Sequence, residues 1–161
     1  MTVDHEISLA LVRSEYAGVL ARAPQFGWKV SDLIESSLEF DVTMNSRIDG
    51  AKYKVELRCD DYKEKPPYIE FINPKTGERG VPSAYPKDAA GDAGAIFHGQ
   101  PCVCHPCSRK AYEAGGPHLN DWGPRMKDWV AMSGGLVTLL DILMMIQARI
   151  NLPGSYAGRM A

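Results

Sequence analysis

The sequence predicts an α+β fold, with helices toward the two ends of the chain and strands between them. Three observations support this prediction. Apolar residues recur at helical spacing over residues 5–23, strand-like patterns fill residues 28–72, and a second helical pattern covers residues 135–150. Because the strands are grouped and do not alternate with helices, an antiparallel sheet is expected, within a single domain over residues 1–161.

The first helix is expected over residues 5–23. Asp4 stands where an N-cap is expected, and Pro24 is expected to end the helix. Its apolar side chains recur at steps of three and four residues: Leu9, Val12, Tyr16, Val19 and Leu20. Such an amphipathic helix is expected to pack its apolar stripe against a sheet.

Four strand patterns follow, and short loops connect them into an antiparallel meander. Residues 28–30 and 68–72 are the outer two. The inner two alternate apolar with polar side chains and are separated by the turn residues Asp49 and Gly50. Their apolar positions are Leu38, Phe40, Val42, Met44, Tyr53, Val55, Leu57 and Cys59. Cys59 therefore reads as a small buried apolar residue.

The remaining segments are less regular. Residues 73–95 are rich in Gly, Pro, Ala and Asp, which predicts a long loop or flap. Residues 108–114 are expected to form a short helix and residues 120–124 a turn.

The last helix is expected over residues 135–150, with Ser133 as a candidate cap. Met144 and Met145 are expected to lie in the core. The helix should end at Asn151, and residues 155–161 are expected to be loosely held.

The segment from His98 to Cys107 carries the strongest chemical pattern. Its ten residues hold three of the four cysteines, two of the four histidines and two prolines. Prolines restrict the backbone around the sulfurs, which indicates that sulfur is held in place for a purpose.

Three kinds of site and one structural role fit this segment. A cysteine nucleophile needs an accessible sulfur and nearby donors. Cys104 and Cys107 form a Cys-x-x-Cys pair that fits thiol–disulfide exchange. The third kind of site binds zinc. In the structural role, the cysteines serve only as packing residues. The zinc ligands would be Cys102, Cys104, His105 and Cys107.

Composition narrows the function classes. The chain is 45% hydrophobic and has a net charge of −2, so it shows no basic excess for nucleic acid or an anionic membrane. Its apolar runs fall short of the ~20 residues of a membrane span, and the N-terminus lacks the pattern of a secretion signal. We therefore expect a cytoplasmic protein without nucleic-acid or membrane partners, in which clustered cysteines are catalytic or metal-binding.

The order of these features resembles the ubiquitin-conjugating enzyme family, especially its divergent bacterial members. The resemblance covers roughly residues 5–153. It is carried by Pro66-Pro67 before the fourth strand and His98 before Gly99-Gln-Pro-Cys102. Asp121-Trp122 after the cysteines and the Leu143-Met-Met-Ile-Gln147 helix followed by Asn151-Leu-Pro153 complete it.

This resemblance implies a ubiquitin-conjugating-like fold with an active-site loop between sheet and last helix, and no cofactor. The implied activity is acyl transfer. A cysteine receives a ubiquitin-like protein as a thioester from an activating enzyme and passes it to a protein target. For the divergent bacterial members the implied setting is an antiphage conjugation pathway.

The implied nucleophile is Cys102 by its spacing from Gly99, with Cys104 as the alternate nucleophile in a shifted register. His98 is expected to shape the active loop or to form only a structural hydrogen bond. Asp121 either orients an incoming amine or serves as a turn residue. The sequence departs from the family pattern in lacking Pro-Asn after His98 and in a longer segment between cysteine and tryptophan.

Overall fold

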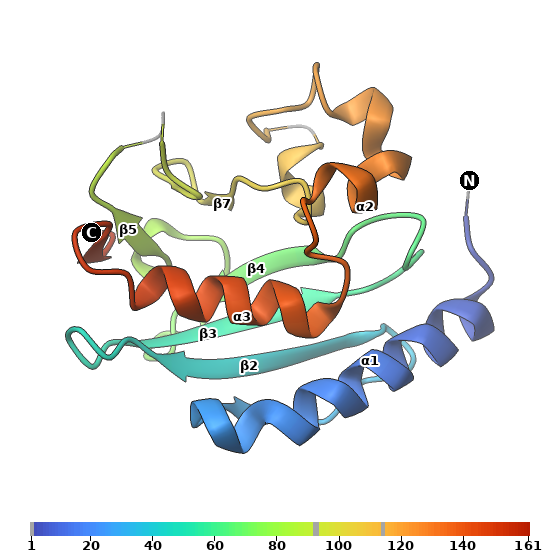
Figure 1. Cartoon of the computed structure of the whole chain (residues 1–161), viewed down its shortest axis with the longest axis horizontal. Coiled ribbons are helices and arrows are strands. Elements are labelled where there is room, and N and C mark those ends of the chain that lie inside the picture. Colours follow the sequence, from blue (N-terminus) through green and yellow to red (C-terminus); the bar gives the residue numbers. More distant parts are fainter. Residues whose placement is uncertain (1, 92–93, 114) are drawn as a thin grey trace.

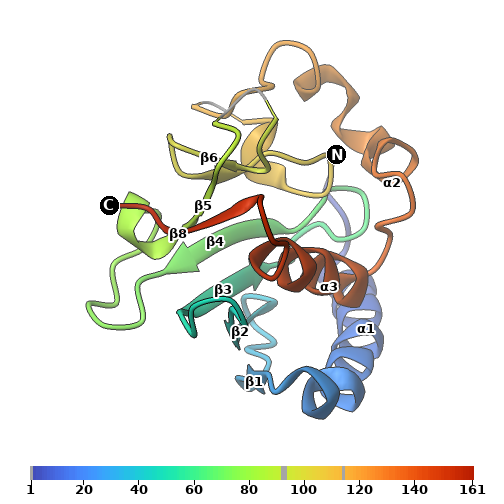
Figure 2. The same ribbon diagram turned by 60° about the vertical axis from the view of Figure 1, so that its left-hand side comes forward.

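The computed structural model describes residues 2–91, 94–113 and 115–161. It contains an N-terminal helix, a four-stranded antiparallel sheet of order β1-β2-β3-β4, and a helix near the C-terminus, which confirms the α+β class. Their bounds are α1 His5–Phe26, β1 Lys29–Val30, β2 Glu39–Asn45, β3 Lys52–Arg58, β4 Tyr68–Ile72 and α3 Leu139–Ile150. Figures 1 and 2 show α1 and α3 side by side on one face of this sheet.

The apolar side chains that alternate with polar ones in the strand sequences form the core between the sheet and the helices. Val42 lies opposite Val55, and Val55 lies opposite Phe71, so three neighbouring strands present apolar side chains in one row. All three are fully buried. Cys59 is buried as expected. The register is strongly specified, because a slip by one residue would turn every one of these side chains toward solvent.

Pro24 does not end α1, contrary to the sequence expectation. Asp4 caps the helix by accepting from the Glu6 amide, as predicted, but the helix continues to Phe26. A proline near the end of a helix costs one hydrogen bond, and here Gly27, at φ 68°, closes the last turn. The ring of Phe26 stacks on Trp28, with centroids 4.6 Å apart.

The last helix begins later than expected, at Leu139. Gly134 and Gly135 adopt positive φ values of 61° and 103°, which interrupts a helix at this point. Thr138 is the N-cap and forms a capping box with Asp141. Ser133 instead donates to the carbonyl of Trp129, at 2.6 Å.

The two methionines of this helix differ from one another. Met145 packs against the core, as expected. Met144 is 37% exposed, because it falls on the outward face of the shorter helix.

Short elements occupy the segments expected to be irregular. They are the 3-10 turns η1 Pro82–Ala84, η2 Arg109–Ala111 and η3 Gly123–Asp128, the strands β5 Pro86–Asp88, β6 Phe97–His98, β7 Cys102–Val103 and β8 Tyr156–Arg159, and the helix α2 Trp129–Met132. The expected flap over residues 73–95 thus contains a strand, with its residues 92–93 outside the described part. The expected helix over 108–114 is only the turn η2, and residue 114 lies outside the described residues.

The C-terminal tail is not loosely held. β8 pairs antiparallel with β5, and Tyr156 and Met160 are both 8% exposed. The phenolic groups of Tyr156 and Tyr53 lie 2.6 Å apart in a hydrogen bond. Burial of an aromatic and a methionine offsets the cost of ordering the tail. No helix in the described part of the chain has both the length and the apolarity needed to span a bilayer.

Candidate active site

The cysteine segment forms a small hairpin beside the sheet. β6 and β7 pair so that His98 lies opposite Cys102 and Phe97 opposite Val103. Asp88, on β5, holds the base of this hairpin. Its carboxylate accepts from the amides of Ile96 and Phe97, at 2.8 and 3.1 Å. Because Asp88 is only 4% exposed, the hairpin has a fixed position relative to β5 and β8.

The three sulfurs of the segment lie in different environments. Cys102 and Cys107 are buried, at 3% and 0% exposure, and burial raises the pKa of each thiol to about 12. Cys104 lies between them and is half-buried. Its amide donates to the carbonyl of Ile96, at 2.6 Å, which fixes the backbone just past β7. Cys104 is therefore the member of the three that reagents and substrates can reach most directly.

His105 follows Cys104 and is held as a neutral imidazole. The amide of Cys107 donates to its Nδ1, at 3.2 Å, so the ring proton resides on Nε2. Burial and, to a lesser extent, the nearby Arg149 guanidinium lower the pKa of His105. Next to Cys104 the protein thus holds an uncharged ring whose free N–H is a hydrogen-bond donor.

Arg109 fixes the segment on its C-terminal side, and sequence reasoning missed it. It is 4% exposed, and its backbone amide and Nε donate to the carbonyls of Pro67 and Pro66, at 3.0 and 2.9 Å. Its Nη1 pairs with Asp60, at 2.8 Å. The sequence offered one signal, two adjacent prolines whose carbonyls need a donor from elsewhere.

Asp121 does not lie with the cysteines. It is exposed and pairs with His118, at 3.0 Å, and this hydrogen bond lowers the pKa of the carboxyl group. His118 stacks on Trp122, with ring centroids 3.6 Å apart. Among the described residues, no hydrogen bond or ion pair joins the Asp121 side chain to the cysteine hairpin. Its hydrogen bond to His118, three residues earlier, is consistent with the expected role of a turn residue.

His98 does lie with the cysteines, half-buried on β6 opposite Cys102. This placement suits its expected part in shaping the active loop.

The alternative zinc site is not assembled. Across residues 2–91, 94–113 and 115–161, no group of three or more His, Cys, Asp or Glu side chains is arranged to hold a metal ion. Two of the four expected ligands, Cys102 and Cys107, are buried in the core, and the Nδ1 of His105 is already engaged by a backbone amide.

The environment of the sulfurs does not favour thiol–disulfide exchange by Cys104 and Cys107 either. All four cysteines are in the reduced form, and Cys107 is fully buried. The elevated pKa of the Cys107 thiol opposes the thiolate that disulfide exchange requires.

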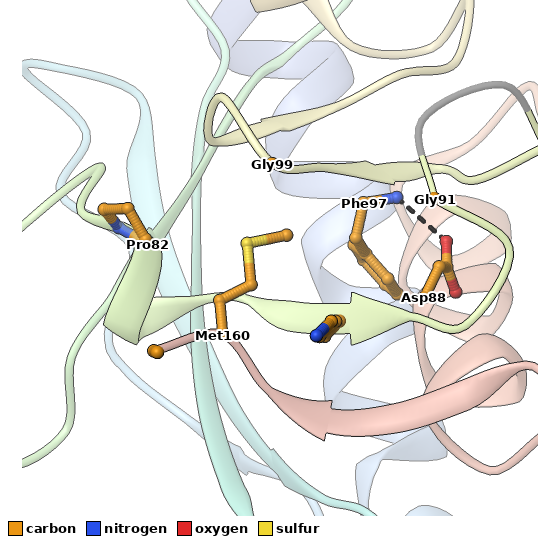
Figure 3. A pocket seen from close by; sticks show the side chains of 8 residues that line it. Pro82, Asp88, Gly91, Phe97, Gly99 and Met160 are labelled. Carbon is orange, nitrogen blue, oxygen red and sulfur yellow. Dashed lines mark hydrogen bonds between the residues drawn. The ribbon is translucent and has the colours of Figure 1, made fainter.

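A pocket of about 380 Å³ adjoins the hairpin. Figure 3 shows Phe97 and Met160 in its wall, with Gly99 of the hairpin turn and Pro82 of η1 beside them. The pocket thus brings together the hairpin and the C-terminal tail, two segments far apart in sequence. Its apolar side chains fit an apolar group on a bound chain.

No family model, curated protein or solved structure matches this chain. What the protein does is therefore inferred from the fold and from the chemistry of the cysteine hairpin.

Proposed function

We propose that this protein carries a ubiquitin-like protein as a thioester on Cys104, in a fold of the ubiquitin-conjugating type. The observation that carries the proposal is the half-buried Cys104 at the end of a short hairpin. Along the chain this hairpin follows the last strand of the four-stranded sheet and precedes the helix α3, and Figure 1 shows it beside β4. An N-terminal helix, a meander, a cysteine loop and a late helix follow one another in the order that the family resemblance implies.

Burial argues for Cys104 and against Cys102. Spacing from Gly99 favours Cys102, but a thiol with a pKa of about 12 at 3% exposure is neither ionised nor reachable by a bulky donor. If Cys104 is the nucleophile, the residue before it is Val103, which is fully buried in the core. The proposal therefore assigns the thioester to Cys104.

The reaction is a pair of acyl transfers at one sulfur. The Cys104 thiolate attacks the thioester carbonyl held by the activating enzyme, a new C–S bond forms, and the enzyme's thiolate leaves. A target amine then attacks this carbonyl, an amide forms, and Cys104 regains its proton as a thiol. Both steps pass through an oxyanion that needs hydrogen-bond donors. The Nε2–H of neutral His105, the next residue, is a donor suited to this task.

The surroundings suit the extended, glycine-ended tail of a ubiquitin-like protein. The pocket beside the hairpin would take an apolar side chain of that tail against Phe97 and Met160. The proposed partners are an activating enzyme, the ubiquitin-like protein and a protein target. The proposed setting is an antiphage conjugation pathway in the bacterial cytoplasm.

A charging assay tests this function. The protein is mixed with ATP and with the activating enzyme and ubiquitin-like protein of its own organism. The adduct is then followed by gel shift with and without reductant. We expect a reductant-sensitive adduct that Cys104→Ala abolishes and that Cys102→Ala and the core control Cys59→Ala both retain.

Two results would contradict parts of the proposal. Loss of the adduct in Cys102→Ala, with retention in Cys104→Ala, would move the nucleophile by two residues and leave the acyl-carrier function intact. An adduct that persists in every single cysteine variant, or no adduct with the wild-type protein, would overturn the function itself.

A further inference from the structure

A basic hollow lies at the end of the sheet where β2 turns into β3. It has a volume of about 460 Å³ and is lined by Gly50, Ala51, Lys52, Pro74, Lys75 and Arg159. These residues come from the β2–β3 turn, the turn after β4 and the end of β8. None of them lines the pocket beside the cysteine hairpin. The basic hollow is therefore a feature separate from the proposed thioester site.

Arg159 is fixed in position, although no carboxylate in the described part of the chain forms an ion pair with it. Its guanidinium donates to the carbonyls of Ser83 and Ala84, at 3.0 and 3.4 Å, and to the carbonyl of Lys52. It also lies over the ring of Tyr53, 4.4 Å from the centroid. These partners are neutral, so they orient the guanidinium and leave its charge uncompensated. A guanidinium has five N–H donors, and the three hydrogen bonds to these carbonyls leave donors for a ligand.

The two lysines of the hollow are exposed and carry uncompensated charge. Within the described part of the chain, neither Lys52 nor Lys75 forms an ion pair. The carboxylate in the same turn is that of Asp49, which accepts from the Tyr156 hydroxyl and the Ala51 amide. Among the described residues, the lining of the hollow holds three cations and no carboxylate, and the two turns that flank it carry Asp49 and Glu78.

We propose that the basic hollow binds a phosphoryl group. A phosphate monoester carries about −1.5 to −2 charges at pH 7 and presents three acceptor oxygens. Three lining cations suit a doubly charged anion with several acceptor oxygens better than a single carboxylate. An oriented guanidinium between two flexible ammonium groups is suited to three acceptors, because Arg presents a fixed fork and Lys a movable point charge.

Titrations of the full-length protein test this proposal independently of thioester chemistry. One arm adds inorganic phosphate, a second adds a phosphoserine peptide, and a third adds the same peptide without phosphate. Backbone amide shifts are followed by NMR. We expect saturable shifts confined to residues 49–52, 75–77 and 156–159 with both phosphate probes. Tighter binding of the phosphopeptide than of free phosphate would identify a modified protein as the source of the group.

Charge-removing variants make the test specific. Lys52→Ala and Lys75→Ala should each weaken phosphate binding about threefold, and the double variant about tenfold, as expected for exposed ion pairs. Lys127→Ala, at an exposed lysine on η3, is the matched control and should bind like the wild type. Arg159 is left intact because it also holds β8 in place.

Either of two outcomes would overturn the proposal. One is a set of shifts that never saturates and spreads over lysines all around the molecule. The other is a double variant whose affinity for phosphate equals that of the wild type. Neither outcome depends on whether Cys104 can be charged, so the two proposals can fail separately.

Discussion

The degree of burial distinguishes the candidate nucleophiles among the three clustered cysteines more clearly than their spacing in the sequence does. Cys102 and Val103 are both buried at the end of the hairpin, while Cys104, two residues on, is half-buried. The sequence could predict that sulfur is concentrated here. It could not rank the sulfurs, because β7 is two residues long and its burial depends on contacts with β4 and η2, which no local pattern reports. Arg109 escaped prediction for the same reason, since its partners Pro66 and Asp60 are more than 40 residues away.

At the level of single residues, thiol alkylation should discriminate among the cysteines. In the native protein at pH 8, iodoacetamide should modify Cys104 first and leave Cys59, Cys102 and Cys107 largely unmodified. With a pKa of about 12, roughly one Cys102 thiol in ten thousand is ionised at pH 8, and its burial slows the reagent further. Peptide mass mapping over time measures the order of modification.

The control for this experiment is the protein unfolded in urea, in which all four thiols should react at similar rates. Modification of Cys102 ahead of Cys104 in the native protein would contradict the burial on which the choice of nucleophile depends.

Among the elements, periodicity predicted the long helices and the sheet but not their ends. The structure confirms the helices and the alternation in β2 and β3, but the predicted stripe of α1 was wrong at Leu20, which is 45% exposed. The ends depend on single residues. Two glycines delay the start of α3, and Gly27 lets α1 continue past Pro24. Thr138 and Asp141 stand at the spacing of a capping box, and Gly134 and Gly135 shortly before them are the sequence signal for a helix that begins at this point.

Thr138→Ala should destabilise the protein through this cap. The Thr138 hydroxyl accepts from the Asp141 amide, at 3.1 Å, and its loss leaves a helix-terminal donor without that partner. The expected cost is about 1 kcal/mol in the free energy of unfolding. In a chain of this size that corresponds to a fall of about 2–4 °C in Tm. Differential scanning calorimetry measures the change.

Ser14→Ala is the matched control, because Ser14 is exposed in the middle of α1. It should leave Tm unchanged or raise it slightly, since alanine is the better helix former. An equal fall in Tm in both variants would show that the Thr138 cap makes no specific contribution to stability.

In the whole molecule, the largest departure from expectation is the C-terminal tail. Residues 155–161 are expected to be loosely held because they follow the last predicted helix at the end of the sequence. Instead β8 completes a second small sheet with β5, and Tyr156 closes over Tyr53. Such pairing joins segments about 70 residues apart, and no local pattern in a four-residue strand reports it. Local sequence therefore predicted the central layers, while the packing around the hairpin depends on long-range contacts.

Removal of residues 155–161 should accordingly destabilise the whole domain. It deletes a buried tyrosine and a buried methionine and uncovers β5, which supports the hairpin through Asp88. The expected loss is about 3–5 kcal/mol, the size of truncating one large core side chain. Urea denaturation followed by tryptophan fluorescence measures it.

The comparison is a chain that lacks only Ala161, which is exposed and should unfold at the wild-type urea concentration. A shortened protein without residues 155–161 that also unfolds at that concentration would show that β8 is dispensable.

The position of the chain end has a practical consequence for anyone who labels this protein. Ala161 lines the same pocket as Phe97 and Gly99, so a purification tag or fluorescent fusion joined there would emerge beside the reactive hairpin. Such a fusion would compete with incoming partners and lower measured activity for reasons unrelated to the protein itself. Figure 1 shows α1 beginning at the opposite end of the molecule, which makes the N-terminal side the better place for a label.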